Sequence, residues 1–100
     1  MNILSQHIKE INGLCASHRL KSLFAFGSAI RSDFKKDSDI DLIVEFEPLE
    51  HKKYADNYFE LKFSLEKLLK HPIDLLESKA IKNPYFKSNI EGQMQRIYGH

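Results

Sequence analysis

The sequence predicts an α/β arrangement of the α+β type, in which helices pack against a small mixed β-sheet. A short apolar run from Leu23 to Phe26 ends at Gly27, which is typical of a buried strand that stops at a residue with unusual backbone angles. The segment from Asp39 to Phe46 has an apolar residue at every second position from Ile40, as a strand with one buried face does. Segments with helical spacing flank these strands, and the predicted order is α-β-β-α-β-α.

The segment before the first strand is predicted to be helical. Its apolar residues recur every three or four positions, which places them on one face of a helix that ends before Leu20. These residues are Leu4, Ile8, Ile11 and Cys15. Because Cys15 belongs to this face, we expect a small core residue and not a reactive thiol.

A long helix is predicted after the second strand. Pro48 ends that strand, and residues 48–53 are expected to form an exposed polar loop. The helix follows with Tyr58, Leu61, Leu65 and Leu68 on its apolar face. His71-Pro72 stops it.

The chain is expected to close with a short strand and a helix. Residues Ile73 to Leu76 form the predicted strand. Asn83-Pro84 then resembles the start of a final helix, since asparagine caps helices and proline is tolerated in the first turn. The apolar face of that helix would consist of Phe86, Ile90, Met94 and Ile97.

Composition favours a single domain spanning residues 1–100. The 100 residues are 42% hydrophobic, which suffices for a core without disulfides or a structural metal. The net charge of +1 comes from interspersed charges, so we expect no direct binding of nucleic acid and no membrane association. One cysteine and the lack of a signal-like or membrane-spanning stretch predict a soluble protein of the cytoplasm.

The motif with the clearest chemistry is Gly27-Ser28, ten residues, then Asp39-Ile40-Asp41. Ser28 can cap a short helical turn whose free N–H groups would bind a phosphate. Strand alternation puts Asp39 and Asp41 on one face, where two carboxylates repel each other unless a cation lies between them. Mg²⁺ fits, since it binds one or two protein carboxylates together with water and phosphate oxygens.

Two further residues are candidates for the same site. Asp74 lies between apolar neighbours on the last predicted strand, so its carboxylate would point away from the core; an exposed aspartate without a role is the alternative. Arg31 could bind phosphate oxygens through its guanidinium or form a structural salt bridge to Asp33 or Asp37. A third carboxylate would allow two divalent cations to hold the attacking and leaving oxygens.

These residues carry a resemblance to nucleotidyltransferases of the DNA polymerase beta superfamily, and among them to the minimal, MNT-type group. It rests on residues 27–33 and 38–44, extends to the segment around Asp74, and covers nearly all of the chain. The sequence departs from the family at Ile30 and Ser32, where alanine and glycine are usual, which affects expectations of activity more than of fold. The resemblance implies a single nucleotidyltransferase domain with a polymerase-beta-like fold.

The resemblance implies Mg²⁺-dependent transfer of a nucleoside monophosphate, AMP from ATP, to a hydroxyl. Asp39, Asp41 and Asp74 would be the catalytic and metal-binding residues, with two ions, and Gly27, Ser28 and Arg31 would bind the phosphates. MNT-type proteins resemble antitoxins that modify a tyrosine of a HEPN-type toxin, which makes such a toxin the expected partner. The alternatives are an antitoxin or assembly subunit that only binds its partner, and transfer to a small molecule such as an aminoglycoside. The sequence leaves open the base of the nucleotide, the acceptor, and whether the chain forms homo- or hetero-oligomers.

Overall fold

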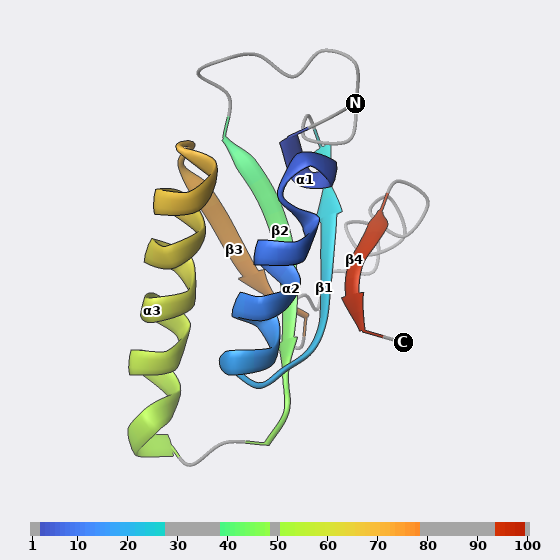
Figure 1. Ribbon diagram of the computed structural model, residues 1–100. Helices are drawn as coiled ribbons and strands as arrows, with labels where there is room; N and C mark the ends of the chain where they lie inside the picture. Colours follow the sequence, from blue (N-terminus) through green and yellow to red (C-terminus); the bar gives the residue numbers. More distant parts are fainter. Residues whose placement is uncertain (1–2, 28–38, 49–50, 79–93, 100) are drawn as a thin grey trace.

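The computed structural model describes residues 3–27, 39–48, 51–78 and 94–99 (Figure 1). The helices and strands are α1 (Ile3–Gln6), α2 (Ile8–Ser17), β1 (Leu20–Phe26), β2 (Ile40–Phe46), α3 (His51–Leu69), β3 (Ile73–Glu77) and β4 (Gln95–Gly99). The predicted order is therefore observed from the first helix through the third strand. The one-residue break at His7 divides the first predicted helix into α1 and α2.

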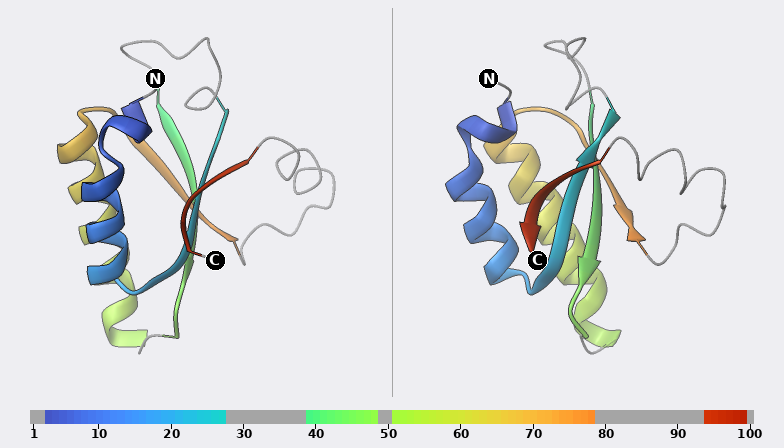
Figure 2. Two further views of the ribbon diagram at one scale, coloured as in Figure 1. Left: turned by 45° about the vertical axis from the view of Figure 1, so that its right-hand side comes forward. Right: turned by 90° about the vertical axis from the view of Figure 1, so that its right-hand side faces the viewer.

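The strands form one mixed sheet in the order β3-β2-β1-β4. β1 runs antiparallel to both β2 and β4, whereas β2 and β3 are parallel. All three helices lie on the same face of this sheet, as the two views in Figure 2 show. The predicted α+β class, a mixed sheet with helices packed against it, is confirmed.

The core fills the space between the helices and the sheet. Alternation along β2 turns Ile40, Leu42 and Val44 toward the helices, and each is at most 1% exposed. The helices contribute Leu61 and Leu65, which are fully buried. The remaining members of the cluster are Leu4, Ile11, Cys15, Leu20, Leu23, Ala25, Leu69, Ile73, Leu75 and Ile97.

The prediction of a final helix is wrong for the last residues of that segment. Residues 79–93 lie outside the described residues, but Gln95–Gly99 forms strand β4 and pairs with β1. The spacing of Met94 and Ile97 fits a helix, yet Ile97 is buried because β4 extends the sheet beside β1. Sheet pairing over a short segment therefore overrides a local pattern that cannot distinguish the two structures.

Two smaller expectations are corrected. Ile8 was assigned to the buried face of the first helix but is 36% exposed; it is the first residue of α2, whereas Ile11 and Cys15 further along the same helix are buried as predicted. The loop expected to extend to Lys53 is shorter, because α3 begins at His51. In the part of the chain that the structure describes, no helix has the length and apolar character needed to cross a membrane.

Candidate functional site

Asp41 and Asp74 lie side by side on neighbouring parallel strands. The β2–β3 register pairs Asp41 with Asp74, and pairs Ile40 with Ile73 one position earlier. Both isoleucines are buried under the helices, so both aspartates are on the opposite face of the sheet. Neighbouring strands are about 4.8 Å apart, so the sheet itself holds these two carboxylates together.

The two carboxylates differ in their access to solvent. Asp41, on an inner strand, is half-buried, whereas Asp74, on the edge strand β3, is exposed. A larger molecule therefore reaches Asp74 more easily than Asp41. No helix covers this face within the described residues (Figure 2).

Gly27 completes this corner of the sheet from the β1 side. It directly follows β1 and has φ of +71°, a conformation that favours glycine, as the sequence predicts. A Cβ atom at this position would lie 2.7 Å from Oδ2 of Asp41. A residue with a side chain at position 27 would therefore displace the Asp41 carboxylate from its present position.

Asp39 lies next to this pair but outside the strand. β2 begins at Ile40, whose N–H donates to the carbonyl oxygen of Pro72 at 2.9 Å and so starts the parallel ladder. Asp39 directly precedes it and is exposed. Three predicted acidic residues thus occur at one end of the β2–β3 pair.

Other predicted site residues are not placed by the structure. Ser28 and Arg31 lie outside the described residues, as do Asp33 and Asp37, the alternative partners of Arg31. Among the described residues, no group of three or more His, Cys, Asp or Glu side chains is arranged to hold a metal ion. The described geometry therefore consists of the Asp41–Asp74 pair, Gly27 and the adjacent Asp39.

A second row of side chains crosses the same face next to the carboxylates. Phe24 pairs with Ile43 on β2, and Ile43 pairs with Leu76 on β3. The guanidinium carbon of Arg96 lies 6.0 Å from the centre of the Phe24 ring, within the range of a cation–π interaction. Sequence reasoning missed Arg96 because it assigned this segment to a helix; read as a strand, the segment puts a cation beside the acidic end of the sheet.

The side chains assigned to packing have that role. Cys15 is fully buried, and burial raises the pKa of its thiol from 9.0 to about 12, so the thiol stays protonated at neutral pH. Tyr58 donates a hydrogen bond from its hydroxyl to the carbonyl oxygen of Leu75. Burial, followed by the nearby charges of Glu77 and Asp74, raises the pKa of Tyr58.

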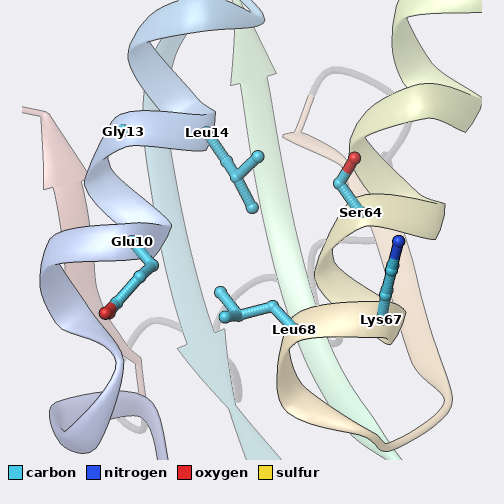
Figure 3. A pocket seen from close by; sticks show the side chains of 6 residues that line it. All are labelled: Glu10, Gly13, Leu14, Ser64, Lys67 and Leu68. Atoms are coloured by element: carbon cyan, nitrogen blue, oxygen red, sulfur yellow. The ribbon is translucent and has the colours of Figure 1, made fainter.

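A hollow lies on the other side of the molecule, between α2 and α3 (Figure 3). It has a volume of about 600 Å³, and Leu14 and Leu68 point toward each other across it. Its other lining residues are Glu10, Gly13, Ser64 and Lys67. Because the helices separate it from the carboxylates, it is not part of the site described above.

Comparison with known proteins places these features in a family. The model of the nucleotidyltransferase domain family matches residues 4–97. A candidate protein adenylyltransferase of Methanocaldococcus jannaschii is 38% identical over 89 residues, which are 89% of this chain and 85% of the relative. The protein adenylyltransferase MntA of Thermococcus cleftensis is 31% identical over 87 residues, 87% of this chain and 82% of that protein.

Solved structures show the same fold. A candidate minimal nucleotidyltransferase superposes with a TM-score of 0.77 at 27% identity and covers 95% of both chains. A toxin–antitoxin complex with AMP-PNP matches with a TM-score of 0.69 at 21% identity, over 93% of this chain and 73% of that chain. A complex of tri-AMPylated Shewanella oneidensis HEPN toxin with MNT antitoxin matches with a TM-score of 0.66 at 20% identity, over 97% and 73%.

Proposed function

This chain belongs to the nucleotidyltransferase domain family, in its minimal, MntA-like group, and from that membership we propose that it transfers AMP from ATP to a partner protein. The acceptor we propose is a tyrosine hydroxyl of a HEPN-type toxin, which the modification would inactivate. The observation that carries the proposal is the register that pairs Asp41 with Asp74, with Gly27 against the carboxylate of Asp41. The adenylyltransferase relatives and the complexes with AMP-PNP and with an AMPylated toxin support the choice of AMP and of the acceptor.

The order of residues across the sheet indicates on which side the ATP phosphates and the acceptor protein would bind. Gly27, directly after β1, would lie on the phosphate side, together with Ser28 and Arg31. Asp74 on the exposed edge strand would lie on the acceptor side, where a partner protein can approach. Asp41 lies between the two and would interact with both.

The donor set of the site fits magnesium. Asp39, Asp41 and Asp74 offer carboxylate oxygens, and Mg²⁺ typically takes one or two of these and completes its shell with water and substrate phosphates. When bound, two such ions would neutralise the phosphate charge and increase the electrophilicity of the α-phosphorus. The three aspartates are the residues we propose to hold them, although in this structure their side chains are not gathered into a three-carboxylate cluster.

The proposed reaction conserves atoms and charge with the groups named. The acceptor hydroxyl oxygen forms a bond to the α-phosphorus of ATP, and the bond from that phosphorus to the oxygen bridging it to the β-phosphate breaks. Pyrophosphate leaves, and the proton of the hydroxyl passes to a carboxylate oxygen of Asp74, whose exposure makes it accessible. Gly27 contributes by leaving room for the carboxylate of Asp41.

The test measures the intact masses of both proteins and the toxicity of the partner in one experiment. The chain is co-expressed with the product of the neighbouring gene, incubated with Mg²⁺ and each nucleoside triphosphate, and both proteins are weighed intact. We expect the partner to gain whole AMP units, and expect none with Asp41→Asn. The matched control is Glu45→Gln on the same strand and the same face, which we expect to retain the activity.

Two outcomes would replace the proposal. If the partner is neutralised without a change in mass, and equally well by Asp41→Asn, the chain acts by binding alone. If an added aminoglycoside is labelled and the partner is not, the acceptor is a small molecule. The first outcome would contradict enzymatic activity, and the second only the proposed acceptor.

A further inference from the structure

The outer face of α3 carries two exposed phenylalanines. Phe59 is 49% exposed and Phe63 is 60% exposed, although Leu61 and Leu65 on the inner face of the same helix are fully buried. The two rings are one helical turn apart and stack with centroids separated by 6.1 Å and planes inclined by 25°. They therefore form one continuous apolar surface instead of two scattered side chains.

This surface extends along the helix. Ala55 lies one turn before Phe59 and is also exposed, so positions 55, 59 and 63 follow one side of α3. A helix that meets water on its outer face normally carries polar residues there. Phenylalanines at two adjacent turns of that face are instead typical of a helix that packs against another helix.

Charged residues flank the phenylalanine pair with opposite signs. Asp56 lies one turn before the pair and Lys67 one turn after it, and helical geometry puts both on the same side of the outer face. Both are exposed, and neither belongs to an ion pair within the described parts of the chain. Measured along the helix axis, the two charges lie at about 8 Å and about 9 Å from the midpoint of the pair.

We propose that α3 packs antiparallel against α3 of a second copy of this chain, about a two-fold axis that passes between Phe59 and Phe63. In that arrangement Phe59 of one copy meets Phe63 of the other, twice, and four rings form the centre of the interface. The same symmetry brings each Asp56 opposite the Lys67 of the other copy. Lys70 lies a further turn from the axis, where salt screens its charge.

The self-complementary order of these residues is the reason for choosing a second copy as the occupant. A two-fold interface requires a residue and its partner at equal distances on opposite sides of the axis, and both the rings and the opposite charges satisfy this requirement. The helices lie on one face of the sheet and the carboxylates on the other, so this pairing leaves the carboxylate site open (Figure 2). The inference does not depend on the proposed activity.

The size of the apolar surface determines how tightly we expect the dimer to associate. The two rings expose roughly 200 Å² of apolar area per chain, less than a standard interface of about 800 Å² per partner. We therefore expect a reversible dimer with a dissociation constant of roughly 1–100 µM. Sedimentation equilibrium over that concentration range measures it on the intact chain.

The first arm of the experiment removes a ring. Phe63→Gln retains helix propensity, and because the ring is mostly exposed the monomer should fold normally by circular dichroism. We expect roughly 100-fold weaker dimerisation. Ile8→Gln is the matched control, since it removes an exposed apolar side chain from α2, outside this surface, and should leave the dissociation constant unchanged.

The second arm exchanges the charges and tests the antiparallel register. Asp56→Lys and Lys67→Glu should each weaken the dimer by roughly 5- to 30-fold, because each places like charges opposite each other. The double variant restores opposite charges and should return to within about threefold of the original value. A surface used without this register would show no such recovery.

Three results would overturn the inference. The chain could remain monomeric throughout the concentration range, or form a dimer that Phe63→Gln does not weaken. The double variant could also dimerise no better than the weaker single variant, which would exclude the register. If the chain is monomeric alone and Phe63→Gln abolishes its binding to a different protein, the surface belongs to the interface with that protein.

Discussion

Gly27→Ala should impair the candidate site much more than it destabilises the fold. The residue has φ of +71°, in the left-handed region, where a side chain is strained. The added Cβ would lie 2.7 Å from Oδ2 of Asp41, about 0.7 Å short of an ordinary contact of 3.4 Å. Either the backbone or the Asp41 carboxylate therefore has to move.

The two effects differ in size. A non-glycine residue in the left-handed region costs about 1–2 kcal/mol, which for a chain of this length lowers Tm by roughly 4–16 °C. Displacing a carboxylate by a comparable fraction of an ångström from its working position reduces the rate of transfer by about 100-fold. The protein should thus remain folded at room temperature and transfer AMP very slowly.

The assay measures Tm by thermal unfolding and the initial rate of AMP transfer by intact mass. Gly13→Ala is the matched control, since Gly13 is in the middle of α2 and a Cβ there would meet nothing within 4 Å. It should raise stability by about 0.5–1 kcal/mol and leave the rate unchanged. Gly27→Asn separates the two causes, because asparagine tolerates the left-handed region but still brings a Cβ toward Asp41.

The reasoning fails if Gly27→Ala transfers AMP at the original rate with an unchanged Tm, since neither strain nor contact would then matter. It fails in part if Gly27→Asn recovers the rate as well as the stability. That result would attribute the loss in Gly27→Ala to backbone strain alone. Loss of stability without loss of rate would show that Asp41 can move without cost.

The remaining predictions concern the core, the pH dependence and the acceptor side. Leu65→Ala should cost about 2–5 kcal/mol in urea unfolding because Leu65 is fully buried, whereas Phe63→Ala on the outer face should change stability by less than about 0.5 kcal/mol under conditions where the chain is monomeric. Burial raises the pKa of Cys15 from 9.0 to about 12, so its contribution to stability is complete below pH 9.0 and is lost as the pH rises toward 12. Wild type should therefore lose about 1 kcal/mol more than Cys15→Ala between about pH 8 and about pH 10, and equal losses would contradict this. Asp74→Asn should slow transfer by about 100-fold or more and leave ATP affinity within about threefold. Asp41→Asn should lower both the transfer rate and the ATP affinity. Equal effects of the two variants on ATP binding would contradict the assignment of Asp74 to the acceptor side.

Local sequence patterns were sufficient for segments whose pattern fits only one type of secondary structure. The alternation in Ile40–Phe46 places one apolar row under the helices, and burial of that row fixes which face the aspartates occupy. The run before Gly27 ends where the backbone enters the left-handed region, so glycine marks the end of β1. These inferences need only neighbouring residues; the structure confirms them for Asp41 and for the end of β1, whereas Asp39 lies outside β2.

Patterns of helical spacing were less reliable near the end of the chain. Met94 and Ile97 fit a helix, yet residues 95–99 form β4 because β1 offers an unpaired edge and Ile97 fills the core. The same error concealed Arg96, whose place over Phe24 depends on the strand. A strand at a sheet edge is stabilised by a partner distant in sequence, which a short window cannot detect.

The sequence by itself determined the chemistry available to this protein: a glycine, a serine and three aspartates at spacings that place carboxylates on one face of a sheet. Only the tertiary structure decided that Asp41 and Asp74 are direct neighbours, that a side chain at position 27 would collide with the carboxylate of Asp41, and that Phe59 and Phe63 remain outside the core. Periodicity along the chain assigns a face to each side chain, since it follows from the backbone of one element. The register between strands and the direction of each helix depend on which apolar surfaces are buried together, and that is decided when the elements pack.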